Sequence, residues 1–341
     1  MTLLYGFDLS AVTDFALGQT DSQVETNIAP AFPSSSTPSA GAMFSKATDG
    51  SLHSMRHRYQ ANVRNIQNFF TPITAQDECY LVYDVMFESG FDFGDSAGDG
   101  GTVTPGQRTD ATALKLPGLG NDAQNNSGGA FNTTGFSVRG YITGQNDDGN
   151  PFDTRDGAAL SINIYSNSGS EVLQCPMDFG VTPWGAATSG TTAGCGDPRL
   201  HKIETDVWYT LIFGVIHNVA TPSNSTVRMW MRKHGTHSAP VEALEKTGLT
   251  LTSDPSANGT DQFVFSTFHG GPATEDWMPD AESFARFANY KIFSTEAEAI
   301  AEATPGAAVT PLSITSPTDN ATDVGPGAVT FTGAVDDNAT R

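Results

Sequence analysis

Short stretches in which apolar and polar residues alternate recur along the chain and dominate its hydrophobic pattern. In residues 79–87, alternation places Leu81, Tyr83, Val85 and Phe87 on one face, because successive side chains of a strand point to opposite sides. Similar runs recur at 52–59, 135–142, 159–165, 207–217, 227–232, 262–268 and 285–293. Loops of uneven length join them, as is typical of two curved antiparallel sheets that face one another. The pattern therefore predicts an all-β sandwich with few helices.

Two of the predicted strands carry their polar residues in regular rows. The polar row of the first strand consists of Ser137, Arg139 and Tyr141. The polar row of the second strand consists of Ser161, Asn163 and Tyr165. If the two strands are neighbours in a concave sheet, both rows line one groove. Any half-exposed antiparallel strand alternates in this way, so the rows alone are a weak indication of a binding site.

Composition divides the chain into three segments. Residues 1–47 mix short strands with a run rich in proline, serine and alanine, which predicts an N-terminal arm or linker. Residues 48–304 hold the strand pattern and predict one large all-β domain, closed by a helical turn at 294–303. Residues 305–341 resemble a linker and the start of a bacterial immunoglobulin-like module, and they are too few for a complete module of ~100 residues.

The chain is strongly acidic, with 38 Asp and Glu residues against 17 Lys and Arg residues and a formal net charge of -21. A field of this sign repels nucleic acids and anionic membranes, so neither is an expected partner. A locally basic cleft can still bind an anionic polymer, because the Debye length is roughly 5 Å or less at marine ionic strength. The acid-rich composition fits a marine habitat, although ordinary solubility explains it equally well.

Three spaced segments share a pattern that is more specific than any one of them. Lys115, one of only six lysines, lies between apolar neighbours in the Leu-Lys-Leu-Pro-Gly-Leu run of residues 114–119. Phe-Ser-Val-Arg follows at 136–139, and Phe-Ser-Thr-Phe-His-Gly-Gly at 265–271. Together these segments resemble the jelly-roll alginate and glucuronan lyases, which cut uronic-acid polysaccharides by β-elimination. The resemblance covers roughly residues 48–295.

The resemblance implies a concanavalin A-like β-jelly roll, lyase activity on an anionic polysaccharide and no cofactor. It also implies a site built from Lys115, Ser137 and Arg139 with two tyrosines of a Tyr-x-Tyr strand. Only the second tyrosine is present, as Tyr165, because Asn163 replaces the first. This departure is compatible with a different uronic acid, a different division of acid and base roles, or lost catalysis. In the last case the chain would be a non-catalytic carbohydrate-binding module, or an adhesion protein displayed on a virion or cell surface.

The chemistry of β-elimination explains why such residues are needed. The C5 proton of a uronate is barely acidic beside a carboxylate, so that carboxylate must be neutralised before a base removes the proton and an acid protonates O4. Arg139 suits the first task because a guanidinium pairs bidentately with a carboxylate, and Asn163 could assist by hydrogen bonding.

Lys115 and Tyr165 are both candidates for the proton transfers. Desolvation would depress the pKa of Lys115, and neighbouring cations would lower the pKa of Tyr165 from its ordinary value of ~10. Lys115 could instead pair electrostatically with the substrate, or the Pro-Gly that follows it could simply open a turn.

Further polar residues complete the predicted substrate-binding set. The set consists of Ser137, Tyr141, Asn163, His269, Arg58 and Arg228. His269 stands at a strand end before two glycines, where an imidazole with a near-neutral pKa could reach the substrate. A hydrogen-bonded structural histidine is the alternative. Other cations of the same segments, such as Arg56 and Arg232, are interpreted as scattered surface charge.

The chain shows no zinc-ligand spacing, and two other features were considered as stabilising sites. Asp92, Asp95 and Asp99 lie in a glycine-rich loop and could ligate a structural calcium ion, although the spacing is not that of an EF-hand and a solvated acidic loop is the alternative. Cys175 and Cys195 bracket another loop and could form a disulfide. Cys79 starts a strand and is expected to be a small core or edge residue.

The sequence starts without a basic segment followed by a long apolar stretch, so no signal peptide is expected in this chain. No stretch is long and apolar enough to predict a membrane span. We therefore expect an extracellular or virion-associated protein that acts as a monomer or as part of a larger multi-domain protein.

Overall fold

The computed structural model describes residues 3–32, 43–50, 52–61, 63, 67–91, 114–121, 135–143, 158–166, 169–174, 202–217, 224–252, 259–269, 279 and 281–305. All of these residues fall in one compact unit. The predicted C-terminal module from residue 306 onward lies outside the described residues. So do the aspartates of the predicted calcium loop and the two cysteines of the predicted disulfide.

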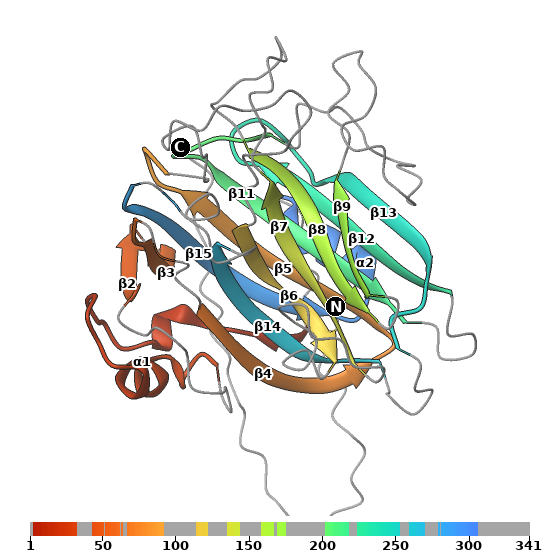
Figure 1. The fold of residues 1–341 in the computed structure, drawn as a ribbon, viewed down its shortest axis with the longest axis horizontal. Coiled ribbons are helices and arrows are strands. Elements are labelled where there is room, and N and C mark those ends of the chain that lie inside the picture. Colours follow the sequence, from red (N-terminus) through yellow and green to blue (C-terminus); the bar gives the residue numbers. More distant parts are fainter. Residues whose placement is uncertain are drawn as a thin grey trace, which may run out of the picture. The chain divides into compact units, whose positions relative to one another are not determined.

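The described strands form two antiparallel sheets (Figure 1). The first is eight-stranded, with the order β13-β12-β11-β5-β15-β3-β2 and with β1 paired to β15. Its strands are β1 (Leu3–Gly6), β2 (Phe44–Asp49), β3 (Leu52–Tyr59), β5 (Glu78–Phe87), β11 (Trp208–Ile216), β12 (Ser225–Lys233), β13 (Val241–Leu249) and β15 (Ser283–Phe293).

The second sheet is seven-stranded, with the order β10-β8-β7-β6-β14-β4 and with β9 paired to β8. Its strands are β4 (Gln67–Gln76), β6 (Leu114–Asn121), β7 (Phe136–Thr143), β8 (Ala158–Ser166), β9 (Gly169–Gln174), β10 (Lys202–Ile203) and β14 (Thr260–His269). The predicted all-β sandwich of two antiparallel sheets is therefore confirmed.

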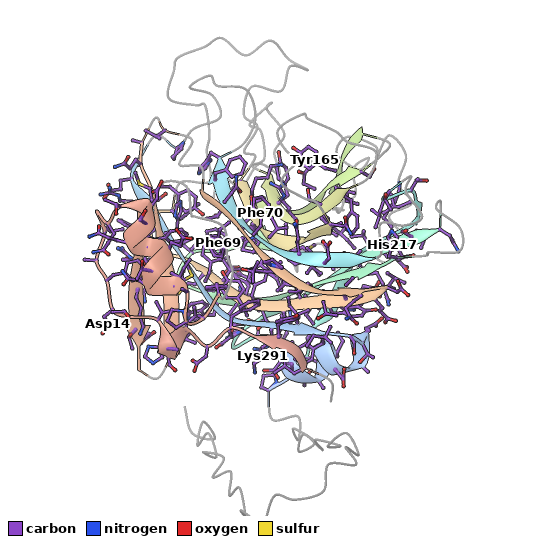
Figure 2. The ribbon with its side chains drawn as sticks, turned by 90° about the horizontal axis from the view of Figure 1, so that it is seen from below. Asp14, Phe69, Phe70, Tyr165, His217 and Lys291 are labelled. Atoms are coloured by element: carbon purple, nitrogen blue, oxygen red, sulfur yellow. The ribbon has the colours of Figure 1, made fainter. Side chains whose placement is uncertain are left out.

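The apolar faces of the two sheets pack against each other and form the core. Figure 2 shows the sheets as stacked layers, with Tyr165 on one layer and Lys291 on the other. Gly140 of β7 marks a close approach between them, because a Cβ there would lie 2.9 Å from the Phe213 ring and 3.2 Å from the Tyr83 hydroxyl. The predicted core residues of β5 are fully buried: Leu81, Tyr83, Val85 and Phe87.

The N-terminal segment, for which the sequence predicted an arm with short strands, also contributes to the core. Besides β1, it contains the short helices η1 (Leu9–Ala11) and α1 (Asp21–Ile28). Helix α1 begins with a capping box, in which the Thr20 hydroxyl and the Gln23 side chain each accept a backbone N–H of the other residue. Ile28 and Phe32 are fully buried, and the Phe32 ring stacks 5.9 Å from the ring of Phe263 in β14.

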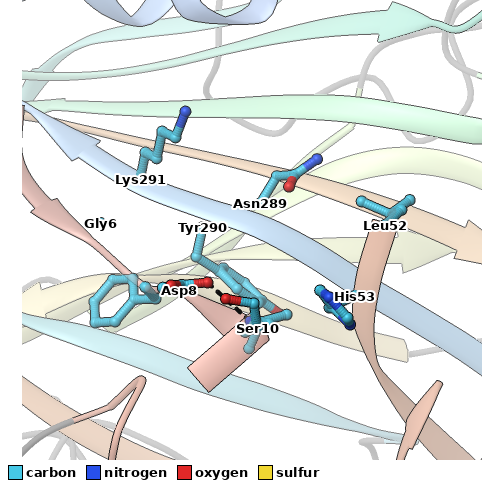
Figure 3. A pocket seen from close by; sticks show the side chains of 10 residues that line it. Gly6, Asp8, Ser10, Leu52, His53, Asn289, Tyr290 and Lys291 are labelled. Atoms are coloured by element: carbon cyan, nitrogen blue, oxygen red, sulfur yellow. Dashed lines mark hydrogen bonds between the residues drawn. The ribbon is translucent and has the colours of Figure 1, made fainter. Parts of the chain in front are cut away.

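Strand β15 changes its neighbour along its length. It pairs with β3 in its first half and, on the same edge, with β1 in its second half. Between the two halves, Asn289 adopts a left-handed backbone conformation with φ 53°, and its amide donates a hydrogen bond to Asp84 Oδ2 at 2.7 Å. A hollow of about 390 Å³ opens where the three strands meet, with Asp8, His53 and Lys291 among its lining residues (Figure 3).

Helix α2 (Glu296–Ala303) follows β15 and packs against β5, β11 and β15 of the eight-stranded sheet. The Thr295 hydroxyl caps its first turn by accepting the backbone N–H of Glu298. Ala299 and Ala303 form its buried side. The helical turn predicted at 294–303 agrees with this element. In the described part of the chain, no helix is long and apolar enough to cross a membrane.

Candidate active site

One face of the seven-stranded sheet, the face that points away from the core, brings the predicted polar rows together. Strands β7 and β8 pair so that Arg139 lies opposite Asn163. On the other side of β7, strand β6 places Lys115 opposite Tyr141. The expectation that the polar rows of β7 and β8 belong to neighbouring strands is therefore confirmed, and β6 adds the lysine to the same surface. We call Lys115, Arg139, Tyr141, Asn163 and Tyr165 the Lys115 cluster.

The Pro-Gly run after Lys115 forms part of strand β6 and does not open a turn. The pairing of β6 with β7 is irregular between Lys115 and Gly118, as in a β-bulge. At Gly118 a Cβ would lie 2.0 Å from the carbonyl oxygen of Val138, so this close approach requires glycine. Pro117 fits where the ladder is interrupted, and its carbonyl accepts a hydrogen bond from the Tyr83 hydroxyl at 3.3 Å. The two residues therefore shape the strand that carries the lysine.

Lys115 is buried, with 6% of its surface exposed. Its Nζ donates a hydrogen bond to Asn163 Oδ1 at 2.6 Å. The same nitrogen lies 4.2 Å from the ring centroid of Tyr141 and 5.4 Å from that of Tyr165. Burial, and then the charge of Arg139, lowers the pKa of Lys115 to about 6. At neutral pH the amine is therefore largely uncharged and has a lone pair that can accept a proton.

Arg139 supplies the permanent positive charge of the cluster. Only 1% of its surface is exposed, and its Nη1 donates a hydrogen bond to the Ser266 hydroxyl at 3.2 Å. The centre of its guanidinium lies 5.7 Å from the Tyr165 ring. Burial lowers the pKa of Arg139 to about 10, which still leaves the group charged at neutral pH. Lys115 and Arg139 thus occupy one buried site in different protonation states.

Two serines lie on the same face of the sheet. Ser137 is fully buried and pairs in register with Tyr165. Ser266 of β14 is also fully buried and was not among the predicted site residues. The alternation of the sequence could have identified it, because the fully buried Phe265 is a core residue and its neighbour must point to the opposite face.

The structure does not bring His269 into the Lys115 cluster. In β14, His269 alternates in phase with Phe265 and Thr267, so it lies on the core face. It is fully buried, and its ring lies edge-on to the ring of Tyr59 at 5.5 Å, while the Tyr59 and Thr267 hydroxyls are hydrogen-bonded to each other. His269 therefore lies on the opposite face of the sheet from the Lys115 cluster.

The structure also separates Arg58 and Arg228 from the cluster, because both lie on the eight-stranded sheet. Arg58 of β3 forms an ion pair with Glu282 at 3.7 Å. Arg228 of β12 pairs with Glu242 at 2.9 Å and is also bonded to Glu296. The sequence shows that these residues point away from a core, but it does not show to which sheet their strands belong.

The described residues include neither a metal site nor the two cysteines of the predicted disulfide. Among the described residues, no group of three or more histidine, cysteine, aspartate or glutamate side chains could hold a metal ion. Cys79 is a free thiol in the core, as expected for a small core residue.

Comparison with known proteins places the fold. No protein-family model matches the chain, and no curated protein matches it in sequence. The PL-14 alginate lyase from Aplysia kurodai is 17% identical and superposes with a TM-score of 0.58, covering 86% of this chain and all of that chain. A double mutant of alginate lyase Aly36B in complex with an alginate trisaccharide is 16% identical, with a TM-score of 0.55 and coverage of 86% and 98%. The chain therefore has the jelly-roll fold that these alginate lyases share.

Proposed function

We propose that the protein is a polysaccharide lyase that cuts a polyuronate, alginate or glucuronan, by β-elimination. One observation carries the proposal: an uncharged lysine and a charged arginine lie in the same buried cluster as an amide and two phenols. Such a combination offers a base, a carboxylate-binding cation and proton donors together. The shared fold with alginate lyases supports the assignment without fixing the substrate.

Arg139 and Asn163 are assigned to the substrate carboxylate. Arg139 keeps its charge, and a guanidinium can place two parallel N–H donors on the two carboxylate oxygens. The Asn163 Oδ1 accepts the hydrogen bond from Lys115. The amide nitrogen of Asn163 can therefore donate a hydrogen bond to the substrate. Neutralising the carboxylate stabilises the negative charge that develops when the C5 proton leaves.

Lys115 is assigned as the base. Its amine has a pKa of about 6, so it is mostly able to accept a proton at neutral pH. Protonation places a second positive charge near Arg139, and this cost is offset when the substrate carboxylate is present. The hydrogen bond to Asn163 fixes the position of the nitrogen relative to the residue that holds the carboxylate.

Tyr165 is assigned as the acid that protonates the leaving oxygen. In the complete step the C5–H bond breaks toward Lys115, its electron pair forms the C4=C5 double bond, and the C4–O4 bond breaks. The O4 oxygen then takes a proton from the Tyr165 hydroxyl, which regains one from solvent or from Lys115. The Tyr165 ring lies 5.4 Å from the Lys115 nitrogen and 5.7 Å from the centre of the Arg139 guanidinium, so the acid is close to the base and to the residue assigned to the carboxylate.

The test is to incubate the purified protein with alginate, polymannuronate, polyguluronate and glucuronan and to follow the ultraviolet absorbance of the unsaturated uronate. We expect absorbance to rise with at least one polymer and the rate to fall about 10²- to 10⁴-fold in Lys115→Ala, the range for loss of a general base. Lys291→Ala serves as the matched control, because this lysine lies on the other sheet and pairs with Glu302.

A flat trace with all four polymers, together with binding to one of them, would reject lyase activity and favour a carbohydrate-binding module. Equal rates for the wild-type protein and Lys115→Ala would reject the assignment of the base while leaving the activity intact. Thermal unfolding of each variant shows whether a lost rate reflects a lost fold.

A further inference from the structure

A row of side chains crosses the outward face of the eight-stranded sheet, on the opposite side of the molecule's core from the Lys115 cluster. In register order, this outward row consists of Ser45, Arg56, Arg286, Met86 and Trp208. The residues that alternate with them along β3, β5 and β15 are buried in the core, so the row points away from it. Four steps between strands of ~4.8 Å give the row a length of about 19 Å.

Two arginines of the row share a single carboxylate. Arg56 donates from Nε and Nη2 to Glu88, both at 2.7 Å, and Arg286 donates from Nε to the same carboxylate at 2.6 Å. These arginines lower the pKa of Glu88, so it is ionised at neutral pH. The centre of the row therefore has one excess positive charge, in a chain whose net charge is -21.

Both arginines retain donors and exposure for a ligand. Their side chains are 25% and 24% exposed, respectively. The three hydrogen bonds to Glu88 use only part of the five N–H donors that each guanidinium carries. The guanidinium of Arg56 lies flat over Phe284, 3.5 Å from the ring centroid, which fixes its orientation.

The two ends of the row differ in what they offer a ligand. At one end, a hollow of about 820 Å³ is lined by Ser45, Arg56 and Lys46, and the Lys46 amine forms an ion pair with Asp14 at 3.0 Å. At the other end, the half-buried Trp208 offers an indole on which the apolar face of a sugar ring can pack. Two arginines in line with an indole suit a ligand that combines carboxylates with sugar rings.

We propose that the outward row is a second binding surface for a carboxylate-bearing polysaccharide, separate from the catalytic cluster. The choice of polymer rests on the proposed function, whereas the existence of the surface does not. Arg56 and Arg286 bind carboxylates of successive or nearby sugars, and Trp208 packs against a ring. Binding here holds the enzyme on the polymer between cuts, which raises the effective concentration of substrate at the Lys115 cluster.

The same sheet provides an internal control. Arg228 is also half-buried on the outward side, and its guanidinium stacks near Trp230 at 4.6 Å. Three carboxylates surround it, those of Glu242, Glu245 and Glu296. This group has an excess of negative charge and is not expected to bind a polyanion.

The experiment is affinity electrophoresis in gels that contain alginate, with dextran gels as the neutral control, on proteins that carry Lys115→Ala so that the polymer is not cut. We expect Arg286→Gln and Trp208→Ala each to weaken retardation by alginate roughly tenfold, the effect of about 1.4 kcal/mol for a charge-assisted contact. Glu88→Gln should strengthen it, because it frees donors and removes one negative charge.

Matched variants separate the surface from a general charge effect. Arg228→Gln and Glu242→Gln change the net charge by the same amounts as Arg286→Gln and Glu88→Gln, and they should leave retardation unchanged. The proposal would be overturned if Arg228→Gln changed retardation as much as Arg286→Gln, and Glu242→Gln as much as Glu88→Gln. It would also be overturned if no variant of the outward row changed retardation.

Kinetics distinguish the failure of this inference from the failure of the proposed function. With Lys115 intact, Arg286→Gln should lower kcat/KM on long polymer and leave the rate on a short oligouronate unchanged. A protein without lyase activity that still shows the charge-specific retardation would reject the catalytic proposal alone. An active protein whose rate on long polymer is unaffected by Arg286→Gln would reject the outward surface alone.

Discussion

The lysines and arginines on the two faces of this sandwich have different partners. On the seven-stranded sheet, the described contacts of Lys115 and Arg139 are made with neutral groups, namely an amide, a hydroxyl and phenol rings. On the eight-stranded sheet, Arg228 lies among three glutamates and Lys291 pairs with Glu302. The two faces thus differ in the described partners of their basic side chains, which are carboxylates on the eight-stranded sheet and neutral oxygens or rings on the seven-stranded sheet.

Burial makes the same contrast in energetic terms. Removing an arginine from water costs several kcal/mol unless a partner compensates for the lost hydration. Arg228 recovers part of this cost in the folded chain. Burial acts to lower the pKa of Arg228, but the hydrogen bonds and ion pairs with glutamates together raise it. The pKa of Arg139 is lowered instead. Burial therefore has the larger effect on the pKa of Arg139, whereas the neighbouring glutamates together have the larger effect on the pKa of Arg228.

The sharpest way to break this comparison is to remove one arginine from each face. Arg139→Gln should lower the rate of uronate elimination by about 10²- to 10³-fold, the range for loss of a group that stabilises developing charge. Arg228→Gln should leave the rate unchanged. Initial rates on the best polymer of the first assay measure both. Similar losses in the two variants would show that the difference in partners has no functional meaning.

The pH dependence tests the protonation state of Lys115. Because its pKa is about 6, the elimination rate should fall about tenfold for each pH unit below 6 and level off above it. The measurement is kcat/KM from pH 4.5 to 8 at constant ionic strength. A rate that stays constant down to pH 5 would exclude the lysine as the base and favour Tyr165 in both roles.

The same group makes a prediction about stability. Its pKa in the folded protein lies below the ordinary value of 10.5 for an exposed lysine, so between pH 6 and 10.5 the unfolded state binds more protons. The free energy of unfolding should therefore rise with pH across this window. Lys115→Met, which keeps the volume and removes the amine, should flatten that rise and lower the rate as far as Lys115→Ala does. Urea unfolding at pH 6.5 and 9 measures the difference, and an unchanged slope in the variant would contradict the buried, uncharged amine.

The smallest expected effect concerns Ser266. Its hydroxyl accepts one hydrogen bond from Arg139, so Ser266→Ala should reduce kcat by roughly three- to tenfold with KM for the polymer little changed. Ser266→Thr keeps the hydroxyl and should restore part of the rate. A loss as large as that of Arg139→Gln would mean that the serine contacts the substrate directly and does not act through the arginine.

Local alternation was sufficient to predict much of this molecule. The strand predicted at 135–142 is β7, and the one at 159–165 is β8. Their polar rows meet on one face because neighbouring antiparallel strands keep their inward and outward positions in phase. The resemblance identified Lys115 as a site residue, but β6, the strand that carries it, was not among the predicted strands. Helix α1 escaped prediction because it is only eight residues long and follows a polar stretch.

The positions of Arg58 and Arg228 outside the Lys115 cluster depend on information that is not local in sequence. Arg58 and Arg228 do point outward from their strands, but only the long-range pairing shows that these strands belong to the other sheet. His269 is a different case, because counting in twos from Phe265 already places it on the core face. The prediction of substrate contact depended on the position of His269 at a strand end, and its phase in the strand is the stronger indicator of the face on which it lies.

The pairing of β1 with β15 has a consequence for how the protein is made. Strand β1 can pair only after β15 has been synthesised, and the backbone N–H of Phe7 also donates a hydrogen bond to the carbonyl oxygen of Tyr290. A nascent chain on the ribosome therefore carries an unfinished sheet edge until β15 has emerged. Contacts between such distant positions slow folding. We expect production of this domain to depend on chaperones, and a tag or truncation at the N-terminus to affect soluble yield more than one placed after α2.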